Sequence, residues 1–333
     1  MYQRFYGLRD LPFELTPNPS YLFFSARHRE ALSNLEYGLS SAKAVTVLIG
    51  EAGTGKTTLL RAALESERCR NVRCVLVNNP ALSRTEFIEM LAHRFDLGAH
   101  AAESKTALLE ALERVLCERR SRGEITALVI DEAQSLSVEL LEEVRLLANI
   151  ETATEKLLPL VLAGQPELAA RLNDPALRQL KQRVALRCEI PPLELPETAA
   201  YISSRIRTAG GEASRLFTRE AVMLIHEFSR GIPRTISVMC DNALLGGMAL
   251  GRRPVDREIV SEVCRDFDLR SKDDLIDPAV PLANEEAADT SAAGDDRATD
   301  IPSNRDEEER RSNEIGLKLS GPRPSILFGS GNR

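Results

Sequence analysis

The sequence lacks several features that mark particular classes of protein. Its 333 residues include no tryptophan, and only 5% of them are aromatic. No apolar run approaches the roughly 18–20 residues that a membrane-spanning helix needs, and residues 1–5 form no apolar signal segment. The six cysteines are scattered without a CxxC pair, which argues against a zinc site. We therefore expect a cytoplasmic protein with reduced thiols and no membrane span of its own.

An excess of charge is also absent from most of the chain. The net charge is −7, but residues 271–333 hold 14 acidic and 8 basic side chains, which leaves residues 1–270 with a net charge of −1. A nearly neutral body provides no general attraction to a phosphate backbone, so charge does not favour nucleic acid as a partner. Residues 269–333 also lack the apolar density for a core, and we predict a disordered acidic tail there.

Short apolar strands alternate with longer amphipathic helices between residues 44 and 192. The predicted strands cover 45–49, 72–77, 127–130, 158–162 and 184–190, and the predicted helices cover 57–64, 84–95, 104–120 and 137–150. Such nearly continuous apolar strands predict an α/β fold in which helices cover both faces of a parallel sheet.

Two further regions flank this α/β core. Residues 1–43 form an N-terminal segment in which early prolines keep residues 10–24 irregular, before a helix that begins after the N-cap residue Ser25. Residues 193–268 contain only predicted helices, over 196–207, 218–229, 233–250 and 256–267. We therefore expect a small all-helical lid domain after the core.

The strongest motif is a phosphate-binding loop. The pattern GxxxxGK[ST] is matched by Gly50-Glu51-Ala52-Gly53-Thr54-Gly55-Lys56-Thr57, which follows a predicted strand and opens a predicted helix. Its glycines let backbone N–H groups curl around phosphate oxygens, next to the positive end of the helix dipole. We expect Lys56 to reach the β- and γ-phosphates and the Thr57 hydroxyl to bind Mg²⁺, and we include the adjacent Thr58 among the nucleotide-binding residues.

The predicted strand 127–130 ends in two adjacent carboxylates, Asp131 and Glu132. In a protein with a phosphate-binding loop, an aspartate at such a strand end is expected to hold Mg²⁺. The following glutamate is placed to act as a general base toward the attacking water. This strand is third along the chain, which predicts the P-loop ATPase arrangement in which a further strand separates the two motif strands.

Three further positions are candidates for the same site. Arg234, in Gly231-Ile232-Pro233-Arg234, can contact the γ-phosphate from the start of a lid helix, or it is a surface arginine after a turn. Gln165 follows a predicted strand and can sense the γ-phosphate, or it belongs to a simple turn. Arg183, with Arg178 as second choice, could reach a neighbouring subunit's site as an arginine finger, or could lie on a solvated basic face.

These residues together resemble those of AAA+ ATPases, with Gln165 as sensor 1, Arg183 as arginine finger and Arg234 as sensor 2. More closely, residues 1–268 resemble the general secretion pathway protein A (ExeA-like) group. The segments that carry this resemblance include FYGL at 5–8, LEYGL at 35–39, DEAQSL at 131–136, LLANIET at 146–152 and GQPEL at 164–168. The resemblance implies binding of ATP with Mg²⁺, ATP hydrolysis and assembly into a homo-oligomer.

The tail departs from this group, whose members continue into a membrane span and a peptidoglycan-binding region. We therefore expect a short form that drives assembly or remodelling of a cell-envelope secretion or exopolysaccharide export system. Such a protein would be cytoplasmic and peripheral at the inner membrane through its partners. Two alternatives remain open: a DNA-binding AAA+ ATPase of the transposition or initiator type, and a nucleotide-switched adaptor. A helicase is disfavoured because no further helicase motifs accompany the DEAQ segment.

Overall fold

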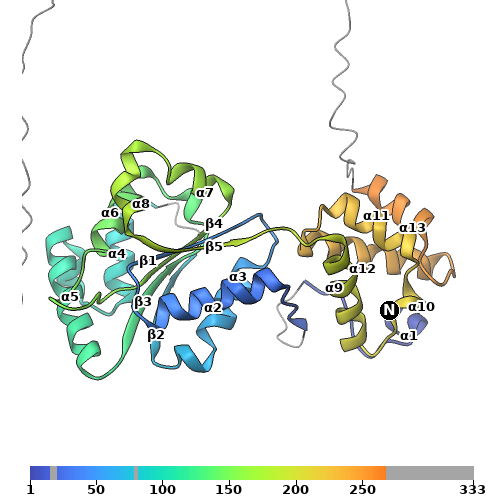
Figure 1. The fold of residues 1–333 in the computed structure, drawn as a ribbon, viewed down its shortest axis with the longest axis horizontal. Coiled ribbons are helices and arrows are strands. Elements are labelled where there is room, and N and C mark those ends of the chain that lie inside the picture. Colours follow the sequence, from blue (N-terminus) through green and yellow to red (C-terminus); the bar gives the residue numbers. More distant parts are fainter. Residues whose placement is uncertain (16–20, 79–81, 268–333) are drawn as a thin grey trace, which may run out of the picture. The chain divides into compact units, whose positions relative to one another are not determined.

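A computed structural model describes residues 1–15, 21–78 and 82–267, so the tail predicted over 269–333 lies outside the described residues. The α/β part contains a strand at each predicted place, and Figure 1 shows their order along the chain. The strands are β1 (Val45–Gly50), β2 (Val72–Val77), β3 (Ile125–Ile130), β4 (Leu160–Gly164) and β5 (Val184–Ile190).

Helices connect these strands and begin at residues with clear capping chemistry. Ser25, Ser104 and Ser137 each accept a hydrogen bond from the third N–H of the helix that follows, and Ser83 forms a reciprocal capping box with Glu86. The helices are α2 (Ala26–Ser40), α3 (Lys56–Leu64), α4 (Arg84–Arg94), α5 (Lys105–Ser121), α6 (Val138–Leu147), α7 (Pro166–Arg171) and α8 (Arg178–Arg183), with short 3₁₀ turns η2 (Glu67–Cys69), η3 (Ala99–Ala102), η4 (Ala133–Ser135) and η5 (Pro175–Leu177).

The five strands form one parallel sheet in the order β2-β3-β4-β1-β5. Strand β4 lies between β1, which precedes the phosphate-binding loop, and β3, which ends at Asp131. The predicted separation of the two motif strands by a further strand is therefore confirmed. Because all five strands are parallel, their carboxyl ends meet at one edge of the sheet, where ligands of such sheets bind.

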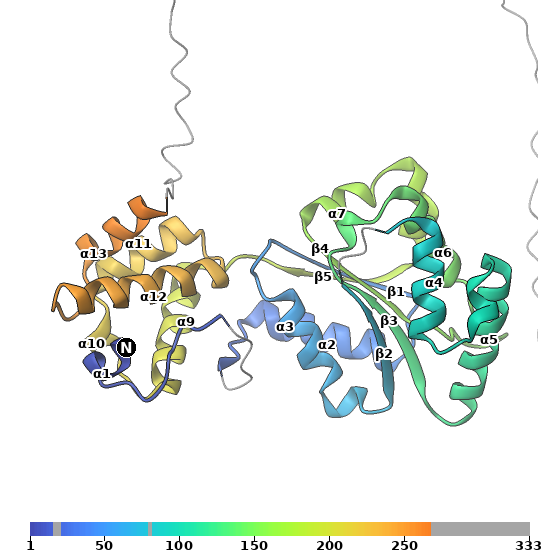
Figure 2. The same cartoon turned by 180° about the vertical axis from the view of Figure 1, so that it is seen from behind.

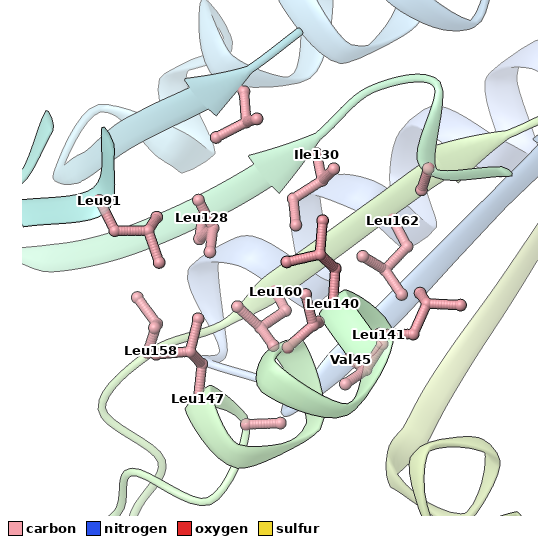
Figure 3. Close-up of a cluster of buried hydrophobic side chains, with 14 of the residues drawn as sticks. Val45, Leu91, Leu128, Ile130, Leu140, Leu141, Leu147, Leu158, Leu160 and Leu162 are labelled. Carbon is pink, nitrogen blue, oxygen red and sulfur yellow. The ribbon is translucent and has the colours of Figure 1, made fainter. Parts of the chain in front are cut away.

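Both faces of the three inner strands, β1, β3 and β4, are buried, as their apolar sequences predict. One face packs against α4, α5, α6 and α8, and Figure 3 shows part of this cluster, in which Leu128, Leu160 and Leu162 of the strands meet Leu140 and Leu147 of α6. The other face, which includes Leu48, packs against α2 and α3. Figures 1 and 2 show these two layers of helices from opposite sides. No described helix is long and apolar enough to cross a membrane.

A second hydrophobic core belongs to the helical region. It is built from α9 (Leu195–Thr208), α10 (Ala213–Leu216), α11 (Arg219–Ser229), α12 (Pro233–Ala249) and α13 (Arg257–Asp266). The first residues of the chain also pack into this core, which the sequence analysis did not foresee. Tyr2 and Tyr6 of α1 (Tyr2–Tyr6) are buried there, and the ring of Phe13 meets that of Phe217 edge to face at 6.3 Å. The helical region therefore contains both an early and a late part of the chain.

Candidate functional site

The phosphate-binding loop spans the residues between the end of β1 and the start of α3. Gly53 and Gly55 adopt positive φ angles of 82° and 101°, a conformation that side chains with a Cβ rarely adopt. Thr54 is buried, and its hydroxyl donates a hydrogen bond of 2.8 Å to the carbonyl of Glu51. The loop is thus held in a tight turn in front of the first N–H groups of α3, which have no partner within the helix. This arrangement suits a phosphate group.

Lys56 carries the positive charge of this loop. Its side chain is buried, and its Nζ donates hydrogen bonds to the carbonyls of Gly50 at 2.8 Å and Glu51 at 3.1 Å. Burial lowers the pKa of Lys56, while the nearby carboxylates of Glu132 and Asp131 act in the opposite direction. The ammonium group is partly desolvated and bound only to neutral carbonyls. A negatively charged phosphate oxygen would therefore bind it more strongly than these carbonyls do.

Thr57 and Asp131 bring the two sequence motifs together. The Thr57 hydroxyl donates a hydrogen bond of 2.7 Å to Oδ2 of Asp131, which is 5% exposed. These two residues lie 74 positions apart in the sequence, and the sheet places them at the same carboxyl edge. A hydroxyl and a carboxylate oxygen are donors of the type that Mg²⁺ prefers, so the residues present fit a magnesium ion with phosphates as further ligands.

Glu132 is held by two amide side chains. Its Oε2 accepts hydrogen bonds from Nε2 of Gln134 at 2.5 Å and from Nε2 of Gln165 at 3.3 Å. The backbone N–H of Gln165 in turn donates to Oε1 of Gln134 at 3.1 Å. Glu132 itself has a positive φ of 56°, an uncommon conformation for a residue other than glycine. A strained backbone and two amides thus fix the position of this carboxylate.

Gln134 is a site residue that the sequence analysis missed. It lies two residues after Glu132 in η4, and its backbone carbonyl accepts a hydrogen bond from Arg171 of α7. A Cβ at Gly164 would come within 2.9 Å of Oε1 of Gln134, so the amide packs closely against the end of β4. The only signal in the sequence was its place next to the acidic pair in the DEAQ segment.

A cavity of about 530 Å³ opens in front of these residues, a size in the usual range of small-molecule sites. The phosphate-binding loop and α3 form one side of it, and Glu132 also lines it. The predicted residues along its wall are Ala52, Gly53, Gly55, Lys56, Thr57, Thr58, Glu132 and Arg234. Tyr201 and Arg205 of α9, together with Tyr21 and Leu22 of the N-terminal segment, line another part of the wall and were not foreseen.

Arg234 reaches this cavity from the start of α12. The helix begins with Pro233, and the N–H of Arg234 donates a hydrogen bond of 3.2 Å to the carbonyl of Gly53 in the phosphate-binding loop. Gly231, just before the helix, has a φ of 72°. Its carbonyl accepts a hydrogen bond of 2.8 Å from the N–H of Leu193, which lies in the segment between β5 and α9. The Gly231–Arg234 segment therefore joins the helical region to the loop directly.

Arg178 and Arg183 lie elsewhere. Both belong to α8, which ends where β5 begins, and neither lines the cavity. Val184 of β5 is in register with Val45 at the start of β1, whereas the phosphate-binding loop follows the end of β1. Arg183, the residue directly before Val184, therefore lies at the opposite edge of the sheet from its own chain's cavity.

His28 was not among the predicted site residues either. It lies on α2, is buried, and its Nε2 is 3.1 Å from the carbonyl oxygen of Thr54 in the phosphate-binding loop. The sequence placed this histidine on a helix before the core, but nothing in its local pattern indicated which part of the core it would contact.

Comparison with known proteins agrees with this arrangement. Residues 39–172 match the AAA domain family. Over 255 residues the chain is 38% identical to the general secretion pathway protein A of Aeromonas hydrophila, an alignment that covers 77% of this chain and 46% of that protein. The chain thus spans about half the length of this curated relative.

Solved structures show the same fold at low sequence identity. Cdc6p from Pyrobaculum aerophilum superposes with a TM-score of 0.57 and 18% identity, over 77% of this chain and 70% of that one. A Drosophila ORC structure with bound DNA gives a TM-score of 0.57 and 19% identity, over 78% and 65% of the two chains. The predicted AAA+ P-loop fold and the resemblance to the general secretion pathway protein A group are confirmed.

Proposed function

We propose that this chain, which has the AAA+ fold and is related to general secretion pathway protein A, binds ATP with Mg²⁺ in its cavity and hydrolyses it. The observation that carries the proposal is the convergence of two separate motifs at one edge of the sheet. Lys56 and Thr57 from the start of α3 meet Asp131 and Glu132 from the end of β3, with Thr57 and Asp131 in direct contact. The cavity beside them has room for a small molecule.

Each group has a distinct part in this reaction. Lys56 and the N–H groups at the start of α3 bind the β- and γ-phosphates and stabilise the charge that develops on them. Thr57 and Asp131 would hold Mg²⁺, which would supply positive charge to neutralise part of the phosphate charge. Glu132 accepts the proton of the attacking water, and its two amide contacts keep the carboxylate oriented for this step. Arg234 contacts the γ-phosphate and relates the helical region to the nucleotide state.

Arg183 completes the site of a neighbouring subunit in this proposal, with Arg178 as the alternative. The support is its position, because it lies away from its own cavity and precedes an edge strand of the sheet. An arginine supplied from a second subunit stabilises transition-state charge and couples hydrolysis to assembly. The active form is then a homo-oligomer.

The proposed output of this ATPase is assembly or remodelling of a cell-envelope secretion or exopolysaccharide export system. The support is the name of the relative from Aeromonas hydrophila, of which this chain covers 46%. The protein would act in the cytoplasm and reach the inner membrane through its partners. Pull-down from membrane extracts with the Glu132→Gln protein, which would hold ATP, is the matching experiment. Failure to enrich any envelope export protein over the Lys56→Ala control contradicts this assignment.

Two substitutions test the catalytic proposal. Lys56→Ala should abolish nucleotide binding, because it removes the buried cation of the loop. Glu132→Gln should retain binding and stop turnover, because the amide cannot accept the proton. Binding is measured with a fluorescent ATP analogue and turnover by phosphate release. Hydrolysis by Glu132→Gln at the wild-type rate would show that Glu132 is not the general base.

The same assays separate the alternatives. A nucleotide-switched adaptor would bind ATP and show almost no turnover in the wild-type protein, with or without partners. A DNA-binding ATPase of the transposition or initiator type would hydrolyse ATP faster when duplex DNA is added. We expect turnover that duplex DNA does not raise, because residues 1–270 have a net charge of only −1.

A further inference from the structure

We propose that His28 is a positioning residue that fixes one peptide group of the phosphate-binding loop in the orientation needed to bind a nucleoside triphosphate. This inference rests on the proposed nucleotide-binding function and adds a residue outside its motifs. His28 is on α2, 26 residues before Thr54, and it is 5% exposed. Its Nε2 lies 3.1 Å from the carbonyl oxygen of Thr54.

The hydrogen bonds around the imidazole determine which nitrogen carries the proton. A carbonyl oxygen can only accept, so Nε2 must donate its hydrogen to Thr54. The other nitrogen, Nδ1, lies 2.9 Å from the hydroxyl of Ser25. That hydroxyl accepts from the backbone N–H of His28 as the N-cap of α2 and still has its own hydrogen to donate to Nδ1. The neutral ring with its proton on Nε2 therefore satisfies every partner, and Ser25 holds the donor toward the loop.

This contact matters because the next residue is a glycine. Gly55 has a φ of 101°, and without a Cβ the peptide group between Thr54 and Gly55 has little steric resistance to rotation. In a trans peptide the C=O and the N–H point in opposite directions. When His28 holds the carbonyl of Thr54 on its own side, the N–H of Gly55 must point away from it. Gly55 also lines the cavity of about 530 Å³ beside the phosphate-binding loop.

The loop has a second anchor that does not control this peptide. The hydroxyl of Thr54 donates to the carbonyl of Glu51, which fixes the side chain and the preceding turn. Only the bond from His28 acts on the Thr54 carbonyl itself among the hydrogen bonds of the described residues. His28 thus links the N-terminal segment to the orientation of the backbone donors that would meet phosphate oxygens.

Two variants of the full-length protein separate positioning from packing. In His28→Gln the amide nitrogen takes nearly the place of Nε2 and can still donate to Thr54. In His28→Asn the amide nitrogen takes nearly the place of Nδ1 and cannot reach the loop. Binding of a fluorescent ATP analogue with Mg²⁺ is measured for both, beside the wild type and Lys56→Ala. Thermal unfolding midpoints without nucleotide are measured in parallel.

We expect His28→Asn to weaken binding by about 5- to 150-fold, the range for a buried acceptor left without its partner. His28→Gln should remain within about threefold of the wild type and keep its unfolding midpoint, whereas His28→Asn, which leaves the Thr54 carbonyl unpaired, should also unfold at a lower temperature. The inference is overturned if His28→Asn binds like the wild type, or if both variants lose affinity together with their midpoints. If the wild type binds no better than Lys56→Ala, the proposed function itself fails and this inference falls with it.

Discussion

Replacing Gly231 by alanine tests whether the helical region is tied to the core by close backbone contact. Gly231 is buried, has a φ of 72°, and lies against Leu193, the residue where the chain leaves the core. A Cβ built on Gly231 would be 2.0 Å from the carbonyl oxygen of Leu193, far inside any allowed contact. The backbone would have to move, since no flexible side chain can absorb this clash.

The cost can be worked out from the contacts that this movement breaks. Alanine in the left-handed region costs about 1–2 kcal/mol by itself. Moving the backbone also separates the N–H of Leu193 from the carbonyl of Gly231, now at 2.8 Å, and the N–H of Gly231 from the Ser229 hydroxyl, now at 3.2 Å. Each buried group left without a partner costs about 1–3 kcal/mol. We therefore expect Gly231→Ala to lower the free energy of unfolding by about 3–8 kcal/mol.

Gly251 provides a matched control. It also has a positive φ, 65°, but nothing lies within 4 Å of a Cβ built on it. Gly251→Ala should therefore show only the backbone cost of about 1–2 kcal/mol. The difference between the two alanine variants measures the clash with Leu193 together with the hydrogen bonds that the resulting backbone movement breaks.

Tyrosine fluorescence during urea unfolding is a suitable assay because the chain has no tryptophan. Four of its five tyrosines (Tyr2, Tyr6, Tyr21 and Tyr201) are buried in the core of the helical region, and Tyr37 is exposed on α2. The signal therefore reports mainly on the part of the molecule that the substitution disturbs. If Gly231→Ala lowers the free energy of unfolding by an amount within 1 kcal/mol of the loss for Gly251→Ala, the reasoning is refuted.

The other predictions concern separate features. Phe13→Ala should cost about 3–5 kcal/mol in the same unfolding assay, because the ring is 1% exposed; a cost under 1 kcal/mol would mean that this segment is not part of the lid core. Gln134→Ala should lower kcat by about 10- to 150-fold while the nucleotide Kd stays within about threefold, since it removes a hydrogen bond to a charged carboxylate; unchanged phosphate release would contradict this. Mixing Arg183→Ala with Glu132→Gln subunits should restore turnover that each lacks alone, and absence of recovery would argue against catalysis across subunits. Iodoacetamide at pH 8 should modify the exposed Cys117 first, because burial raises the pKa of Cys74 to about 11, and mass spectrometry identifies the modified residue.

Local sequence patterns predicted the sheet and the centre of the candidate site. The inner strands β1, β3 and β4 are nearly continuous apolar runs, and the phosphate-binding loop and the acidic pair directly follow β1 and β3. Parallel pairing then brings their carboxyl ends to one edge without any further information. For this reason Thr57 and Asp131 could be paired from the sequence. In the structure the Thr57 hydroxyl lies 2.7 Å from Oδ2 of Asp131.

The contacts that the sequence did not predict depend on long-range packing or on unusual backbone. Gln134 reaches Glu132 because Glu132 adopts a positive φ, which no propensity of glutamate predicts. His28 and Phe13 contact elements 26 and 204 residues away. Local sequence patterns do not show which distant part of the chain covers such a residue.

The packing of the first residues into the helical region has a consequence for synthesis of the chain. Tyr2 donates a hydrogen bond to Asp241, 239 residues later, and Arg205 binds the carbonyl of Pro12. At the usual ribosomal rate Asp241 is synthesised roughly 12–50 seconds after Tyr2. The α/β core can fold in that interval, while the tyrosines of α1 still lack the residues that bury them. The packing of the first residues against α9 and α12 is therefore completed only after α12 has been synthesised.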